Sequence, residues 1–343
     1  MHSKGLWRVG AALTACLLLT VGCGRGSGAS SGSSGSTKSS ITIGAVSGSA
    51  ANPAVQVMND AMKKRAKEKG VKLLVETSEN VEEQIAKADA MIAQGVKYLG
   101  LHPWDGAAIA PFIGTAATKG VKVVILIDGV PNVIEQGKAL TFISGNEPAA
   151  AEKIGKWTAT HYTSAAEAAV VTGTPGNLSA DNRTNGFKTG IQGSSVKVVA
   201  EATANWARDQ ALRVAGDMIT AHPKLNVIFG NNDEMAFGAL KAISEAGKSG
   251  KVDVIGWNGT CIGLKALLDG QFVLEAVLPF DLFGAGLIDA ALDDASGKAV
   301  PKKIEPDVPV LTTAEAKAAL AGTQTASPAL VSRLQEASSG SCK

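Results

Sequence analysis

The sequence predicts an α/β protein built from two doubly wound lobes, each a parallel sheet covered by helices. Apolar β runs alternate with helical patterns from residue 41 to about residue 311, which is typical of βαβ units. About 300 residues follow the N-terminal segment, which is enough for two domains of ordinary size. The composition is 45% hydrophobic but only 4% aromatic, with 39 glycines, which suits helices packed closely on parallel strands.

The first lobe begins with a short apolar β run at residues 41–46. The helix after it has a clear start, because Asn52 is a strong N-cap residue and Pro53 suits the first turn. Apolar residues then recur at helical spacing until Gly70, a typical helix end. Further strands are predicted at 71–76, 98–101 and 121–127, and further helices at 81–94 and 106–119. This order gives β-α-β-α-β-α-β with right-handed crossovers.

The second lobe repeats the alternation. Its helices are predicted at 147–162, 181–191, 209–221, 233–246 and 262–269, followed by a helix at 282–295. Its strands are predicted at 168–172, 196–202, 227–230, 252–257 and 272–277, with a terminal strand near 307–311. No structureless linker separates the two series, so the chain is expected to pass directly between lobes at 142–146 and 277–280. The arrangement predicts a cleft between the lobes, at the carboxyl ends of both sheets.

The domain boundaries follow from this order. We expect an N-terminal lobe of residues 41–144 plus 279–308 and a C-terminal lobe of residues 145–278 plus 309–321. Residues 322–343 are expected to form a loose tail.

The N-terminus has the features of a secretory signal over residues 1–22. Lys4 and Arg8 precede an apolar stretch at 11–21, and Gly22 is a small residue at the processing point. The apolar stretch has roughly 11 residues, fewer than the about 20 that a bilayer span needs. The protein is therefore expected to work outside the cytosol, which excludes most cytosolic enzymes and transcription factors.

The residues around the processing point read LLLTVGC. They resemble the lipobox of bacterial lipoproteins, in which the cysteine receives lipid and becomes the mature N-terminus. The resemblance implies a lipid anchor on Cys23 and attachment to the membrane. Thr20 departs from the usual leucine, and an ordinary secretory signal is the alternative. Residues 23–40 begin with Cys23 and continue in glycine and serine, which predicts a flexible spacer.

Charge and cysteines limit the partners further. The 33 basic and 31 acidic residues are well mixed, with a net charge of +2, so nothing points to nucleic acid. Once Cys16 and Cys23 are assigned to the N-terminal segment, Cys261 and Cys342 are left in the body. In an oxidising compartment two such thiols are candidates for a disulfide, worth about 3–4 kcal/mol by loop-closure entropy. Two free cysteines are the alternative.

The sequence carries none of the motifs that would indicate an enzyme. It contains no H-E-x-x-H, no G-x-S-x-G and no P-loop pattern, and two thiols far apart in sequence make a poor metal set. We therefore expect a binding protein with no cofactor and no metal.

Four segments carry a resemblance to a known family. They read SGSAANPAVQVMNDAMKKRAKEKG, RTNGF, AHPKLNVIFGNNDEMAFGALKAISEAGK and VIGWNGT. They resemble the type I periplasmic binding proteins, with the ribose- and galactose-binding branch most similar, over residues 41–321. The resemblance implies two Rossmann-like lobes joined by three hinge crossovers, near 143–146, 277–280 and 307–311. It also implies a monomeric receptor that captures a sugar and delivers it to an ABC permease. Repressors with the same core carry an N-terminal helix-turn-helix, and this chain has a signal-like segment there instead.

Three tryptophans follow predicted strands, where a cleft would open. They are Trp104, Trp206 and Trp257. An indole ring stacks on the apolar C–H faces of a sugar while its N–H donates at the edge. Trp206 also matches a stacking aromatic of the family. The alternative is that each ring fills the end of a lobe, and Trp157, inside a helix, is expected in the core.

Polar candidates come from the same strand ends. Arg183 offers a planar fork of donors and matches the family's ligand-binding arginine; a surface salt bridge is its alternative. Asn232 matches a family ligand residue, and an N-cap role is its alternative, with Asn231 as the ligand residue if the register shifts by one.

Three further polar residues complete the predicted site. Asn258 stands where sugar binders of the family carry an aspartate, and an amide both donates and accepts. Asp128 follows the strand at 121–127, although Gly129 replaces the arginine that follows in the family. Asn52 matches the family's asparagine at the first helix, and helix capping is its alternative.

Departures from the family pattern point away from ribose. Ala54 and Val55 stand where ribose binders have two aromatics, and Val277 replaces a glutamine. Trp104 is expected to replace the missing stacking wall. We therefore expect a larger sugar, a polyol or another hydroxylated small molecule. The alternative function is a binding protein that serves a chemoreceptor or sensor kinase.

Overall fold

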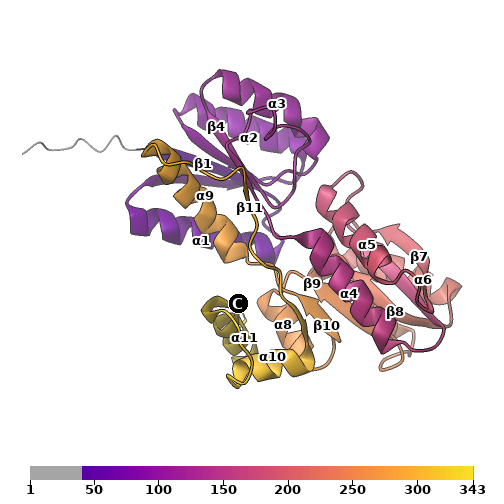
Figure 1. The fold of residues 1–343 in the computed structure, drawn as a ribbon. Helices are drawn as coiled ribbons and strands as arrows, with labels where there is room; N and C mark the ends of the chain where they lie inside the picture. The colour runs from indigo at the N-terminus through magenta and orange to yellow at the C-terminus, as the bar shows by residue number, and fades with distance from the viewer. Residues whose placement is uncertain (1–40, 343) are drawn as a thin grey trace, which may run out of the picture. The chain divides into compact units, whose positions relative to one another are not determined.

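The structure is a computed structural model that describes residues 41–342 (Figure 1). The predicted signal peptide, Cys23 and the Gly/Ser spacer lie outside the described residues. The described chain contains two six-stranded sheets with helices on their faces, so the predicted α/β class with two parallel-sheet lobes is confirmed.

The first sheet belongs to the N-terminal lobe and has the strand order β11-β5-β4-β3-β1-β2. Its strands are β1 (Thr42–Ser47), β2 (Lys72–Thr77), β3 (Tyr98–Leu101), β4 (Lys122–Leu126), β5 (Thr141–Ile143) and β11 (Lys303–Ile304). Every recorded pairing among them is parallel. Helices α1 (Pro53–Lys69) and α9 (Phe280–Ala295) pack on one face, and α2 (Val81–Ala93) and α3 (Gly106–Thr118) on the other.

The second sheet belongs to the C-terminal lobe and has the order β12-β10-β9-β8-β6-β7. Its strands are β6 (Ala166–Thr172), β7 (Val196–Thr203), β8 (Leu225–Gly230), β9 (Asp253–Trp257), β10 (Leu274–Ala276) and β12 (Val310–Thr312). Helices α4 (Glu147–His161) and α5 (Leu178–Gly190) cover one face, and α6 (Arg208–Ala221) and α7 (Asp233–Glu245) cover the other. The β10–β12 pair is antiparallel, because β12 enters the sheet from the opposite direction as the chain returns from the first lobe.

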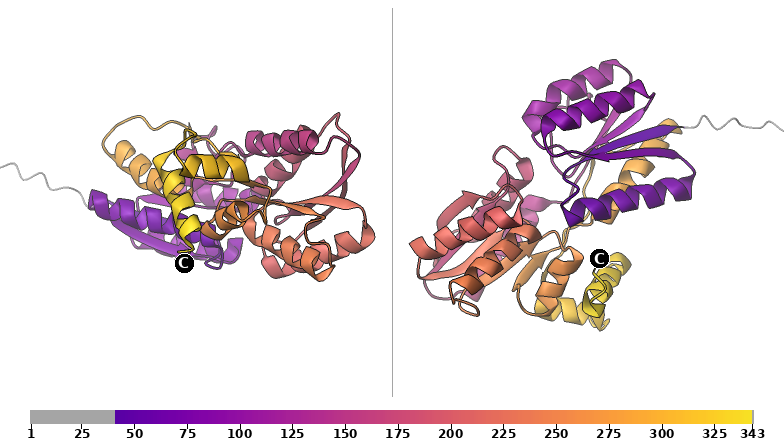
Figure 2. Two further views of the ribbon diagram at one scale, coloured as in Figure 1. Left: turned by 90° about the horizontal axis from the view of Figure 1, so that it is seen from below. Right: turned by 180° about the vertical axis from the view of Figure 1, so that it is seen from behind.

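Helix α1 shows how local sequence builds these elements. The Asn52 side chain accepts a hydrogen bond from the Ala54 amide at the start, and Gly70 ends the helix in the left-handed region. Helices α1 and α9 lie side by side (Figure 2). Their close approach requires Gly284, because a Cβ there would lie 2.2 Å from the Met58 carbonyl oxygen. Alanine at position 284 would push the two helices apart.

The chain passes between the lobes three times: from β5 to α4, from β10 to α9 and from β11 to β12. These passages carry apolar side chains into a shared core. Leu278, Phe283 and Val308 belong to the same buried cluster as residues of both sheets. The lobes are therefore joined by segments that are packed together.

The C-terminal segment differs from the loose tail that the sequence predicted. Residues Pro328–Ser339 form helix α11, which packs against α8 (Cys261–Leu268) and α10 (Thr313–Leu320). The physical reason is burial: Leu330, Leu334 and Ala337 recur at helical spacing and are buried. A disulfide between Cys261 and Cys342 ties the end of this segment to the first residue of α8. None of the described helices has the length and apolarity needed to cross a bilayer.

In each sheet the order of successive strands changes direction between two neighbouring strands. These pairs are β1 with β3 and β6 with β8. In open α/β sheets, ligands bind in the crevice outside the carboxyl ends of strands at such switch points. Candidate residues should therefore follow these four strands.

Candidate functional site

A cleft of about 980 Å³ lies at the carboxyl ends of both sheets. Its volume is near the top of the range of about 300–1,000 Å³ for small-molecule sites. Seven of the residues singled out in the sequence line it: Asn52, Trp104, Asp128, Arg183, Trp206, Asn232 and Asn258. The first three come from the N-terminal lobe and the other four from the C-terminal lobe.

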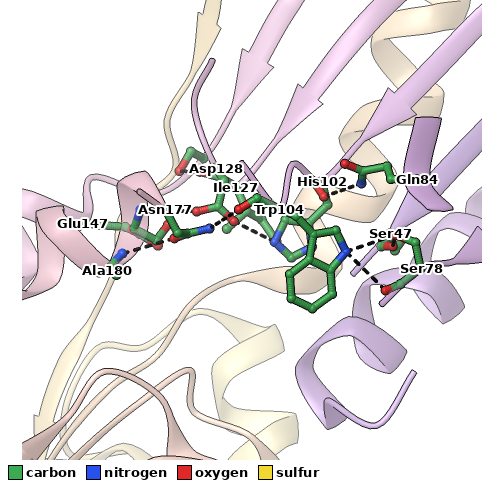
Figure 3. Close-up of polar contacts among 12 residues, drawn as sticks. Ser47, Ser78, Gln84, His102, Trp104, Ile127, Asp128, Glu147, Asn177 and Ala180 are labelled. Atoms are coloured by element: carbon green, nitrogen blue, oxygen red, sulfur yellow. Dashed lines mark hydrogen bonds and ion pairs between the residues drawn. The ribbon is translucent and has the colours of Figure 1, made fainter. Parts of the chain in front are cut away.

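Trp104 stands on the N-terminal side of the cleft, beyond the end of β3. Its Nε1 donates to the Ser78 carbonyl at 3.2 Å and to Ser78 Oγ at 3.1 Å. In Figure 3 this nitrogen points toward Ser78 while the rest of the ring projects away from the strands. The ring is half-buried and lines the cleft.

His102 is a cleft residue that the sequence analysis missed. It follows β3 directly, and its Nε2 lies 2.8 Å from Asp128 Oδ2 (Figure 3). Its backbone carbonyl accepts from Gln84 Nε2 at 2.7 Å, which fixes the start of this loop. Its position could have revealed it, because His102 is the first residue after β3. Trp104, which was singled out, follows the same strand slightly later.

Asp128 connects the two lobes. It is 5% exposed, and its Oδ1 accepts from the Ser179 amide at 3.3 Å, at the start of α5. Burial acts to raise the pKa of Asp128, but the hydrogen bonds from His102 and Ser179, together with the charge interactions with His102 and Arg183, outweigh burial and hold that pKa below its ordinary value. Asp128 therefore presents a carboxylate, an acceptor of hydrogen bonds.

Arg183 lies on the C-terminal side and is buried, so its alternative as a surface salt bridge is wrong. Its Nη2 donates to Glu147 Oε1 at 2.5 Å and its Nη1 to the Asn231 carbonyl at 2.8 Å. The guanidinium also lies over the Trp206 ring at 5.3 Å and the Trp257 ring at 5.0 Å. Burial raises the pKa of Glu147, although the Arg183 charge acts in the opposite direction.

Trp257 does not line the cleft, so of its two interpretations the structure supports the alternative, a ring that fills the end of a lobe. Its side chain is fully buried beneath Arg183 and packs near Phe229, with ring centroids 6.1 Å apart. The reason is the pleat: Trp257 is the last residue of β9 and its side chain enters the face under α4 and α5. Trp157 is half-buried and packs against the same core, as expected.

Asn232 caps helix α7 and also holds Trp206. Its Oδ1 accepts from the Met235 amide at 2.7 Å, and its Nδ2 donates to the Trp206 carbonyl at 3.1 Å. Trp206 has a φ of 65°, and its ring lies against Gly173, where a Cβ would come within 2.1 Å. Asn231, the other candidate of the pair, instead donates inward to α5, at the Ala180 carbonyl.

Asn258 follows β9 with a φ of 119°. Its side chain is buried, and its Oδ1 has no hydrogen-bond partner within the described residues. The residue lines the cleft, so this oxygen is an acceptor that a bound molecule could use. Within residues 41–342, no group of three or more His, Cys, Asp or Glu side chains could hold a metal ion.

Comparison with known proteins gives a consistent result. The sequence model described as "Periplasmic binding protein domain" matches residues 43–299. The chain is 30% identical to a ribose import binding protein of Bacillus subtilis (strain 168), over 78% of this chain and 86% of that protein. It is also 30% identical to a D-ribose/D-allose-binding protein of Pseudomonas aeruginosa, over 66% of this chain and 74% of that protein.

Solved structures show the same similarity. A Mycobacterium smegmatis protein in complex with β-D-fucofuranose superposes with a TM-score of 0.79 at 27% identity, over 86% of this chain and 98% of that one. The Caulobacter myo-inositol binding protein, bound to myo-inositol, gives a TM-score of 0.76 at 27% identity, over 81% of this chain and 95% of that one.

Proposed function

Because this chain belongs to the periplasmic binding protein family, a family of solute-binding proteins that work outside the cytosol, we propose that its cleft captures a hexose, cyclitol or similar polyol for an ABC importer. The seven cleft residues are the proposed ligand contacts, joined by His102. The relatives named above are binding proteins for ribose, allose and myo-inositol, which supports this ligand class.

The observation that carries the proposal is a set of buried polar atoms without partners in residues that line the cleft. Within the described residues, His102 Nδ1, Arg183 Nε and Asn258 Oδ1 have no hydrogen-bond partner. Leaving a buried polar atom unpaired costs about 1–3 kcal/mol. A sugar hydroxyl both donates and accepts, so a polyhydroxylated ligand would satisfy several such atoms at once.

The aromatic lining of the cleft favours a ligand larger than ribose. Val55 is the residue of α1 at the cleft, so this helix contributes no aromatic ring there. Trp104 and Trp206 line the cleft from opposite lobes. We expect the two rings to approach the opposite faces of a ligand when the lobes close.

Closure is expected to occur by bending at the three passages between the lobes. A ligand that contacts both walls stabilises the closed form by its differential affinity for that form. The cleft volume of about 980 Å³ leaves room for the lobes to approach one another around a small molecule.

The same proposal includes a lipid anchor on Cys23. The Gly/Ser spacer that follows would let the lobes reach about 20–25 Å from the membrane surface, as expected for a random coil of its length. This would keep the protein beside its permease.

A thermal-shift panel tests the ligand class. D-allose, D-ribose, D-galactose, myo-inositol and glycerol are added separately to the purified protein. We expect a hexose or myo-inositol to raise the melting temperature more than ribose, because a ligand that binds only the folded state stabilises it by mass action. No shift with any hexose or cyclitol would contradict the proposed class. Arg183→Met in the same panel is the control for binding in the cleft.

A further inference from the structure

We propose that Arg333, on the C-terminal helix α11, is a positioning residue for the ligand site and acts through the backbone of Asn258. The role rests on the proposed function, since it assumes that the Asn258 side chain contacts ligand. Arg333 does not line the cleft and is not a ligand contact.

Arg333 bonds to two segments that are distant in sequence and also paired directly, since the Leu278 amide donates to the Asn258 carbonyl at 3.2 Å. Its Nη1 donates to the Leu278 carbonyl at 2.9 Å, on the passage from β10 to α9. Its Nη2 donates to the Asn258 carbonyl at 3.3 Å and to the Gly259 carbonyl. One guanidinium therefore ties the loop after β9 to the second passage between the lobes. The planar fork of arginine suits this task, because its donors point in fixed, separate directions.

The Asn258 loop needs such support because its backbone is strained. Asn258 has a φ of 119°, which L-residues rarely adopt, and it persists only where the surroundings hold it. The loop amides are held from the inside. Gly259 N donates to Glu275 Oε1 at 2.7 Å, and Thr260 N donates to Asp233 Oδ2 at 2.8 Å. Arg333 supplies donors to the carbonyls of the same loop, so amides and carbonyls are both fixed.

Helix α11 is anchored strongly enough to act as this support. Leu330 and Leu334 are buried in a cluster with Leu264 and Leu267 of α8. The Cys261–Cys342 disulfide closes the other end of the helix onto α8. Since α8 starts directly after the Asn258 loop, both anchors fix Arg333 relative to the same loop.

A purely structural role is the competing explanation, in which Arg333 only helps α11 to dock. Two variants separate the explanations. Arg333→Met keeps the length and apolar stem but removes every donor. Leu334→Ala, the matched control, weakens α11 docking one residue further on without touching the loop carbonyls.

The first measurement is amide hydrogen exchange of the ligand-free full-length protein, which needs no ligand. We expect Arg333→Met to raise exchange in peptides covering 257–260 and 277–280 by at least about tenfold, with the α11 peptide less affected. Leu334→Ala should raise exchange in α11 while the 257–260 peptide stays near wild type. Unchanged exchange at 257–260 in Arg333→Met would overturn the positioning role.

The second measurement is the affinity for D-allose and myo-inositol by calorimetry. We expect Arg333→Met to weaken binding about tenfold, the size of one lost polar contact. Arg333→Lys should bind as weakly, because a single ammonium lacks the fork that places separate donors on the two segments. Full rescue by lysine would contradict the two-segment arrangement.

A double variant tests whether Arg333 acts through Asn258. Asn258→Gly removes the side chain and tolerates the positive φ. In that background Arg333→Met should weaken binding by less than about threefold, because the side chain that it positions is gone. If the two substitutions weaken binding independently, so that their fold-changes multiply, the proposed action of Arg333 through Asn258 is overturned. If the wild type binds neither probe, the ligand class proposed above fails, while the exchange data still decide the positioning role.

Discussion

The two walls of the cleft are built differently. On the C-terminal side, Arg183, Asn232 and Asn258 are all buried, and the first two make hydrogen bonds to other parts of the lobe. Of the three candidates on the N-terminal side only Asp128 is buried; Asn52 and Trp104 are half-buried, and the Asn52 side chain makes its recorded bond within its own helix start. The comparison indicates that the C-terminal wall is preorganised, which reduces the ordering cost of binding there. We expect ligand to bind this wall first and the N-terminal wall to close over it.

The largest effect on stability is expected at the buried ion pair between Arg183 and Glu147. Arg183→Met should lower the free energy of unfolding by about 3–5 kcal/mol, because it leaves the Glu147 charge buried without its partner. Urea denaturation measures the loss. Adding Glu147→Gln to this variant should recover part of it. Wild-type stability for Arg183→Met would show that the C-terminal wall does not depend on this pair.

The next prediction concerns how the free energy of unfolding depends on pH. It involves Glu275 and Asp233, the two buried acids beside the Asn258 loop. Burial and the neighbouring Asp233 charge raise the pKa of Glu275 well above its ordinary value of 4.5. The folded state therefore holds a proton that the unfolded state releases as pH rises above about 4.5. Stability should fall with pH in that window by up to about 1.4 kcal/mol per pH unit.

Glu275→Gln should remove this fall while keeping an acceptor for the Gly259 amide. The variant should match wild type near pH 4 and exceed it at pH 7 in thermal unfolding. Glu135→Gln, at an exposed position, is the control and should leave the pH profile unchanged. If the stability of wild type and Glu275→Gln changed with pH in the same way, the folded state would hold no extra proton on Glu275 and Asp233.

A smaller effect separates the two roles of Asn232. Asn232→Asp keeps the helix-capping oxygen but loses the donor to the Trp206 carbonyl. We expect stability within about 1 kcal/mol of wild type and affinity weaker by about 1–3 kcal/mol. Asn232→Ala should lose about 1 kcal/mol more stability, because the cap is gone as well. Unchanged affinity in Asn232→Asp would remove this residue from the proposed site.

The smallest effect on folding is expected at the N-terminal wall. Trp104→Ala should change the free energy of unfolding by less than about 1 kcal/mol, since a half-buried ring loses little packing. Its affinity for ligand should fall by about 1 kcal/mol, while Trp104→Phe should keep most of it because the stacking face remains. A loss of stability as large as that of Arg183→Met would contradict the contrast between the walls.

The long helices and strands could be predicted from the sequence, because their apolar residues recur over several turns or pairs. The polar residues that follow the strands could then be predicted as candidates for the cleft. Asn52 and Asn232 cap helices α1 and α7, as their alternatives expected, and both line the cleft because each helix begins at the carboxyl end of a strand. The short strands Thr141–Ile143 and Lys303–Ile304 were missed, since two or three residues carry no period. Helix α11 was missed although Leu330, Leu334 and Ala337 recur at helical spacing, because its partner α8 lies far earlier in the chain. The role of Trp257 stayed open because a strand end does not tell which face its last side chain enters.

The closely packed helices α1 and α9 have a consequence for synthesis. Helix α9 and strand β11 complete the N-terminal lobe, yet they follow nearly the whole C-terminal lobe along the chain. During translation the emerging first lobe must wait for more than half of the polypeptide before Gly284 can meet α1. Until then the part of α1 that packs against α9 has no cover, so the N-terminal lobe cannot complete its core before most of the chain has been made.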